Sequence, residues 1–70
     1  MARTFTAVTK KVDDWWLGWT EEIPGVNCQE RTREELFDTL KITLQEALEF
    51  NRMEALRMAA PDYQEELLTL

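Results

Sequence analysis

The chain is most informative for what it lacks: its 70 residues include no histidine and a single cysteine, Cys28. A lone cysteine cannot form an internal disulfide, and without histidine or a second cysteine a structural zinc site is out of reach. No histidine is present to activate Cys28 as a catalytic thiol, so a small buried apolar residue is the better interpretation. These absences argue against an enzyme. We expect no catalytic residue, metal or cofactor.

Long hydrophobic runs are missing as well. The N-terminus does not resemble a signal peptide, and no segment approaches the ~18 apolar residues of a membrane span. A lone thiol also suits a reducing compartment, so we expect a cytoplasmic protein. A single domain over residues 1–70 is expected, and a chain of this size buries only about 60% of its unfolded surface. Small scaffolds usually need a staple, a metal or a partner. The sequence therefore favours a homo-oligomer.

Basic residues are scarce, and the net charge is −6. Residues 1–20 carry a net charge of +1, and residues 21–70 carry −7. Nucleic-acid binding relies on Lys and Arg, so an acidic chain is poorly suited to it. A basic protein partner fits better, because complementary fields speed and select the encounter. An acidic surface that serves only solubility is the alternative. Lys10 and Lys11 with Arg3 form a solvated strand face rather than a phosphate site.

Three short runs rich in β-branched and aromatic residues predict an antiparallel meander. They occupy residues 3–12, 15–21 and 26–30. Asp13-Asp14 predicts a hairpin turn between the first two runs. Pro24-Gly25 predicts a turn before the third, since proline presets φ and glycine tolerates positive φ. The first part of the chain is therefore expected to be a three-stranded sheet.

A helix is expected to begin at Thr32, which forms a capping box with Glu35. An apolar stripe recurs at helical spacing and is expected to cover the sheet. Its members are Leu36, Phe37, Leu40, Leu44, Ala47 and Leu48. Ile42, Phe50 and Met53 fall off this stripe toward the opposite side. They are either scattered surface residues or a second contact face.

The end of the chain allows two interpretations at each of two places. Asn51 either caps a second short helix or lies within a continuing first helix. Pro61 ends whichever helix is present. Residues 64–70 form either a final short strand or a fraying tail. The predicted fold class is α+β.

Three tryptophans within five residues are the main anomaly of this chain. In the second strand Trp15, Leu17 and Trp19 point to one face, while Trp16 and Gly18 point to the other. Gly18 removes bulk in mid-strand, which often marks a close approach.

Val8 and Val12 are expected on the side of Trp16, so that both faces of the sheet are apolar. One helix cannot cover both faces. Either two tryptophans pack in the core and the third caps its edge, or the surplus surface is an interface, and the interface is the favoured interpretation.

The order of these elements resembles the N-terminal domain of HicB-type antitoxins over roughly residues 3–50. The family runs from a Phe/Tyr-Thr-Ala-Val strand through an aromatic strand and a Pro-Gly turn to a short strand and a helix opening on Glu-Glu. The matching residues are Phe5, Thr6, Ala7, Val8, Trp16, Leu17, Gly18, Trp19, Glu22, Ile23, Pro24, Gly25, Gln29, Thr32, Glu34 and Glu35.

The resemblance implies a degenerate RNase H-like fold without the nuclease carboxylates, in which residues EELLTL supply a fourth strand. It also implies a dimer or tetramer that neutralises a small basic HicA-type ribonuclease. We expect a short form without a DNA-binding domain. A stand-alone self-associating structural or regulatory module is the alternative. The residues expected at the partner or oligomer interface are Trp15, Leu17, Trp19, Glu21, Glu22, Ile42, Phe50, Glu65 and Glu66.

Overall fold

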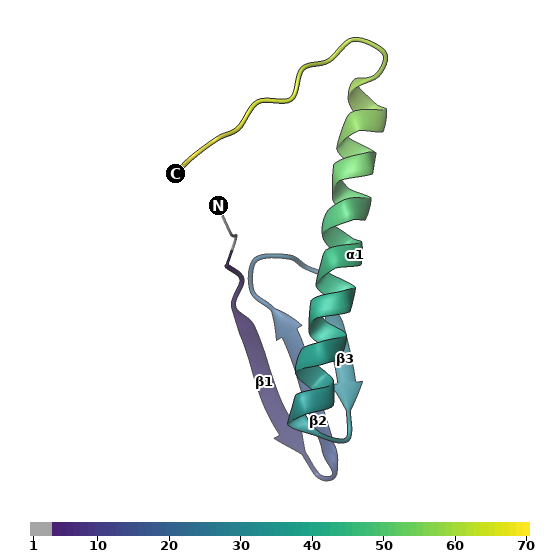
Figure 1. The fold of residues 1–70 in the computed structure, drawn as a ribbon. Coiled ribbons are helices and arrows are strands. Elements are labelled where there is room, and N and C mark those ends of the chain that lie inside the picture. Colours follow the sequence, from purple (N-terminus) through teal and green to yellow (C-terminus); the bar gives the residue numbers. More distant parts are fainter. Residues whose placement is uncertain (1–3) are drawn as a thin grey trace.

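A three-stranded antiparallel sheet and one long helix make up the fold in the computed structural model, which describes residues 4–70 (Figure 1). The strands are β1 (Ala7–Val12), β2 (Trp15–Thr20) and β3 (Asn27–Glu30), in the order β1-β2-β3. The helix α1 (Arg33–Ala59) follows and lies across one face of the sheet. The α+β class and the meander are confirmed. The expected start of the first strand at Arg3 lies outside the described residues.

The hairpin between β1 and β2 turns at Asp13-Asp14, as the sequence predicts. Val12 pairs with Trp15, which leaves only these two residues in the turn. Asp13 has a φ of 56°, a left-handed conformation that Asp and Asn adopt more readily than other non-glycine residues. Such a conformation at the start of a two-residue turn matches the twist of the flanking strands.

The register of this hairpin overturns the expected division of apolar residues between the two faces. Val8 lies opposite Trp19, and Val12 lies opposite Trp15. Directly opposed residues point to the same face of a sheet. The placement of the two valines with Trp16 is therefore wrong. The valines share a face with Trp15 and Trp19 because the two-residue turn sets the register, and a strand pattern alone does not.

The other face of the sheet meets α1 through a close approach at Gly18. A Cβ atom at this position would lie 2.9 Å from Cδ1 of Leu40 and 3.1 Å from Cδ2 of Leu36. Leu36, Leu40 and Val26 are the buried apolar side chains of the core among the described residues. The half-buried residues packed around them are Trp16, Ile23, Cys28, Leu44 and Ala47. Gly18 thus lets the helix lie close to β2, as expected.

The first turn of α1 is held by the predicted cap at Thr32. Its Oγ1 accepts a hydrogen bond from the backbone N–H of Glu35 at 3.1 Å. The same hydroxyl donates to Oε1 of Glu35 at 2.9 Å. The Glu35 carboxylate therefore returns to the capping hydroxyl, and it lies at the positive end of the helix dipole, where a negative charge is stabilising.

The helix continues without a break to Ala59, so Asn51 lies within it and does not start a second helix. Ala47 is the last α1 residue that packs on the core. The 12 residues that follow Ala47 in α1 rise at 1.5 Å each, so the helix extends about 18 Å past the core. Within residues 4–70, no helix has the length and apolar character needed to cross a lipid bilayer.

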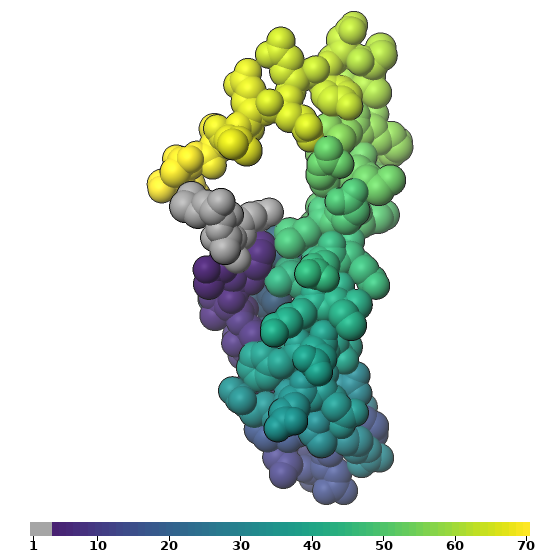
Figure 2. Space-filling view, viewed as in Figure 1, coloured from purple at the N-terminus to yellow at the C-terminus, as the bar shows by residue number. Residues whose placement is uncertain are grey.

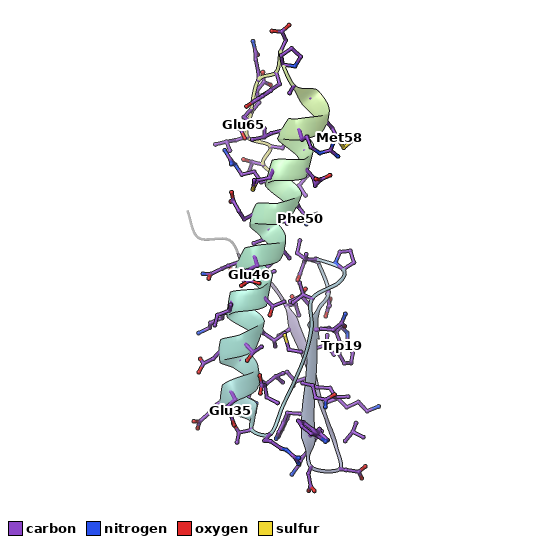
Figure 3. The ribbon with its side chains drawn as sticks, turned by 90° about the vertical axis from the view of Figure 1, so that its right-hand side faces the viewer. Trp19, Glu35, Glu46, Phe50, Met58 and Glu65 are labelled. Carbon is purple, nitrogen blue, oxygen red and sulfur yellow. The ribbon has the colours of Figure 1, made fainter. Side chains whose placement is uncertain are left out.

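Phe50 is exposed, but not because it lies on the side of α1 away from the sheet, where the sequence analysis places it. It lies three residues after Ala47 and seven after Thr43, which bonds to Cys28 of β3, so it belongs to the sheet-facing side of α1 and not to the opposite side. Its side chain is 64% exposed because the sheet ends before that turn of the helix. Figure 3 shows Phe50 above the level of the sheet.

After the helix, residues 60–70 form neither helix nor strand, so the short final strand is not confirmed. This tail turns back alongside the upper half of α1 (Figures 1 and 2). One ion pair joins the two, between Nη2 of Arg52 and Oε1 of Glu65 at 3.6 Å. The leucines of the tail, Leu67, Leu68 and Leu70, are fully or almost fully exposed.

Candidate protein-binding surfaces

The face of the sheet turned away from α1 is an apolar surface that no other described element covers. Its apolar residues, which we call the open sheet face, are Val8, Val12, Trp15, Leu17 and Trp19. Trp15 and Leu17 are half-buried by their neighbours, and Trp19 is 37% exposed. Figure 3 shows Trp19 on the side of the sheet opposite the helix. The surface is therefore formed by side chains of a single hairpin.

The charges on this face are basic. The guanidinium of Arg31 lies 3.9 Å from the ring centroid of Trp15, a cation–π contact. Lys10 pairs with Leu17 from β1, and Gln29 pairs with it from β3. Within the three strands, no acidic residue occupies a position on this face. The open sheet face is thus poorly matched to a basic partner.

A second surface lies on the side of α1 away from the sheet, where Ile42 is 57% exposed. Carboxylates lie four and seven residues before it and four and seven residues after it. Residues at these spacings share one face of a helix. We call this set the acidic stripe, and it consists of Glu35, Asp38, Ile42, Glu46 and Glu49 (Glu35 and Glu46 are labelled in Figure 3).

The members of the acidic stripe are accessible. All five side chains are exposed. One of them has a basic neighbour, since Oε1 of Glu49 lies 3.8 Å from Nη1 of Arg52. An apolar side chain surrounded by charges of one sign resembles the arrangement of a protein interface, in which a central anchor is ringed by a polar rim.

The acidic pair after β2, Glu21 and Glu22, forms hydrogen bonds with Thr6 within the fold. The backbone N–H of Thr6 donates to Oε1 of Glu22 at 2.8 Å. This hydrogen bond stabilises the carboxylate and lowers the pKa of Glu22 below its ordinary value. The backbone N–H of Glu21 donates to the carbonyl oxygen of Thr6 at 3.0 Å. Both glutamates therefore fasten the chain before β1, while the carboxylate of Glu21 remains exposed.

The structure separates the nine residues expected at one interface. Three lie on the open sheet face: Trp15, Leu17 and Trp19. The other six are divided among the turn after β2, the two sides of α1 and the tail: Glu21, Glu22, Ile42, Phe50, Glu65 and Glu66.

Two further sets of residues belong to these surfaces and were missed from the sequence. Val8 and Val12 complete the open sheet face, and a two-residue Asp-Asp turn would have indicated their register. The four carboxylates around Ile42 complete the acidic stripe, and their regular spacing was visible once the helix was placed.

Comparisons of the chain with protein-family models, with curated proteins and with solved structures found no match.

Proposed function

We propose that this chain is a protein-binding module, a HicB-like antitoxin or a module derived from one, that neutralises a small basic HicA-type ribonuclease by covering its surface. Its action needs no chemistry from the chain itself. Inhibition follows from blocking access of RNA to the ribonuclease, and therefore depends only on shape, apolar contact and charge.

The observation that carries the proposal is the acidic stripe with Ile42 at its centre. The stripe is rigid, because all its members lie on one continuous helix whose other side packs on the sheet. It presents four carboxylates, of which one, Glu49, is paired with a basic residue, Arg52. A ribonuclease surface that binds RNA is rich in Lys and Arg, so this stripe is complementary to it in charge.

The resemblance to HicB antitoxins supplies the rest of the proposal. The resemblance implies that a fourth strand joins the sheet of this chain and that the fold is a degenerate RNase H-like one. Residues 65–70 would supply this strand, and the chain would assemble into a dimer or tetramer. The three antiparallel strands and the helix are in the order that the family requires.

A second candidate function is a stand-alone structural or regulatory module that associates only with itself. The open sheet face favours it. Five apolar side chains lie on a face that no described element covers, and such patches on soluble chains usually mark a site of association. Arg31 and Lys10 on this face argue for an occupant other than a basic ribonuclease.

Calorimetric titration of a HicA-type ribonuclease with the intact chain and three variants tests which surface binds. Ile42→Ala removes the anchor of the acidic stripe and is expected to raise Kd about tenfold, or about 1.4 kcal/mol. Met53→Ala is the matched control, because Met53 is exposed to a similar degree (59% against 57%) on the same side of α1, beyond the stripe. Its Kd is expected to equal that of the intact chain.

Trp19→Ala separates the two candidates. If the acidic stripe binds the ribonuclease, Trp19→Ala leaves its Kd unchanged. A loss of ribonuclease binding on Trp19→Ala with no effect of Ile42→Ala would transfer the site to the open sheet face. The absence of any binding by the intact chain, together with a stable oligomer, would support the self-associating module instead.

A further inference from the structure

The side of α1 that packs on the sheet continues past the end of the sheet and carries exposed apolar residues there. Phe50, Glu54 and Met58 follow Ala47, the last α1 residue that packs on the core, by 3, 7 and 11 residues. Residues at these spacings lie on one side of a helix. Phe50 is 64% exposed and Met58 is 79% exposed. The projecting part of α1 therefore leaves uncovered the side that the rest of the helix buries.

The charges on this side are balanced. Nη2 and Nε of Arg57 donate to Oε2 and Oε1 of Glu54 at 2.9 and 3.3 Å, so the two side chains form a bidentate pair. Met53, which is 59% exposed, lies three residues after Phe50 at the edge of this side. We call the whole set the projecting face, and it consists of Phe50, Met53, Glu54, Arg57 and Met58.

The tail does not cover the projecting face. It lies beside Arg52 and Ala59, and the carboxylate of Glu65 pairs with Arg52. Arg52 and Ala59 are about half a turn around the helix from Phe50. Figure 3 shows Met58 and Glu65 on different sides of the upper part of α1. Within residues 4–70, the projecting face is thus left without a covering element.

The projecting part of α1 is short for a helix that stands away from a core. It consists of the 12 residues that follow Ala47. Isolated helices shorter than about 12–15 residues are marginal in water. Burial of Phe50, Met53 and Met58 against an apolar surface would stabilise this segment, because removal of apolar area from water is favourable. A partner on the projecting face therefore accounts for the length of the helix.

The charge of the projecting face favours a second copy of this chain as that partner. The chain has a net charge of −6, so two copies repel one another where their carboxylates meet, as they would across the acidic stripe. Two projecting faces do not repel, because the carboxylate of Glu54 is paired with the guanidinium of Arg57. A basic ribonuclease is attracted to the acidic stripe and not to a neutral face. A neutral apolar face on an acidic chain suits an identical face.

The position of the sheet fixes the relative direction of two such helices. The projecting face lies on the same side of α1 as the sheet. Parallel helices that met through this face would place both sheets in the same space between them. Antiparallel helices place the sheets at opposite ends, and each projecting part then overlaps the other over about 18 Å, or about three turns.

We propose that two copies of this chain form a twofold dimer through their projecting faces, with the two α1 helices antiparallel. Phe50 of each copy lies against Met58 of the other, and the two Glu54–Arg57 pairs meet near the twofold axis. Each helix ends close to where the sheet of the other copy begins. A twofold interface of this kind uses the same face on both copies and closes at the dimer. The proposal rests on the projecting face alone, and it holds whether or not the chain binds a ribonuclease.

Light scattering after size-exclusion chromatography over a range of chain concentrations tests the surface. The intact chain is expected to form a dimer that dissociates on dilution, because an overlap of about three turns is small for a protein interface. Phe50→Glu is expected to raise the Kd of the dimer at least tenfold. Ile42→Glu is the matched control, since it adds the same charge at a similarly exposed position of α1 (57% against 64%), and its Kd is expected to equal that of the intact chain.

Three outcomes of this experiment would overturn the proposal. One is an intact chain that stays monomeric up to about 1 mM. The second is a dimer that Phe50→Glu leaves unchanged, in which case Trp19→Glu shows whether the open sheet face is used instead. The third is an equal loss of the dimer in Phe50→Glu and Ile42→Glu, which would assign the effect to net charge.

A distance between spin labels tests the antiparallel direction. The labelled chain carries Cys28→Ser, so that no native thiol reacts, and Lys41→Cys, which lies outside the projecting face. Lys41 is 13 residues before Glu54, so the two labels of an antiparallel dimer are expected to be separated by about 39 Å along the helices. Parallel helices would bring the two positions to about the interaxial distance of 8–10 Å, and a short distance would overturn the arrangement. Adding Phe50→Glu is expected to remove the dipolar signal.

Discussion

Replacing Gly18 by valine tests whether the close approach between β2 and α1 holds this small core together. The Cβ atom alone would lie 2.9 Å from Cδ1 of Leu40 and 3.1 and 3.2 Å from the two terminal methyls of Leu36. Leu36 and Leu40 are buried, with exposed fractions of 0% and 4%, so they have little room to move. Overpacking of this kind typically costs about 1–3 kcal/mol.

A second substitution, Leu40→Ala, tests whether the cost of Gly18→Val arises from contact with Leu40. Leu40→Ala alone is expected to lower the free energy of unfolding by about 2–5 kcal/mol, because it removes a buried side chain and leaves a cavity. In Gly18→Val/Leu40→Ala the valine occupies part of the space that Leu40 has vacated. The two costs are therefore expected to sum to at least about 1 kcal/mol more than the cost measured for the double variant.

Urea unfolding followed by tryptophan fluorescence measures these free energies. All four proteins are compared at one chain concentration, since association would make the apparent stability depend on it. A domain of this length is expected to have a total free energy of unfolding of about 4–10 kcal/mol, so each change is measurable. Additive costs within about 0.5 kcal/mol, or a Gly18→Val protein as stable as the parent, would refute the close approach.

Three smaller predictions follow from hydrogen bonds in the structure. Thr32→Ala removes the acceptor for the Glu35 N–H and is expected to cost about 1 kcal/mol in urea unfolding, whereas Thr32→Ser is expected to retain most of the stability. The Glu22 carboxylate accepts a hydrogen bond from the Thr6 N–H, which lowers the pKa of Glu22. The contribution of this hydrogen bond to folding stability is therefore present above the ordinary carboxyl pKa and is lost as pH falls through the lowered pKa. An NMR titration that finds an ordinary pKa for Glu22 would contradict this. Cys28 packs against the core, with its Sγ 3.5 Å from the Thr43 hydroxyl, and is expected to react with a thiol reagent more slowly in the folded chain than in urea.

Local signals in the sequence predicted the features that depend on neighbouring residues. The cap at Thr32 and the turn at Asp13-Asp14 are both decided by short-range hydrogen bonding and backbone preference, and both are confirmed. Gly18 was expected to mark a close approach, and the partner it approaches is now identified as Leu36 and Leu40. The turn and the cap also allowed the order of the strands and the start of α1 to be predicted from the sequence.

Features that depend on relative lengths could not be predicted in the same way. The face occupied by Val8 depends on the number of residues in the turn, and a change of one residue would reverse it. The exposure of Phe50 depends on where the sheet ends beneath α1, which no helical pattern reveals. The position of residues 64–70 depends on how far α1 continues, and the sequence left open whether the helix is interrupted at Asn51.

The separation of the residues expected at one interface has a physical basis. A sequence pattern identifies exposed apolar and acidic residues but not which of them share a face. Trp19 and Ile42 lie on opposite sides of a two-layer molecule, one on the sheet and the other on the helix. Basic Arg31 beside Trp15 and acidic neighbours around Ile42 give the two surfaces different charges, and therefore suit them to different partners.

An RNA-cleavage assay tests the proposed function most directly. A fixed amount of a small basic HicA-type ribonuclease is titrated with the intact chain, and the remaining cleavage of a labelled RNA is measured. The proposal predicts that cleavage falls in proportion to added chain and stops at a fixed stoichiometry, and that Ile42→Ala requires more chain for the same inhibition. Full cleavage in the presence of a large excess of the chain would contradict the proposal.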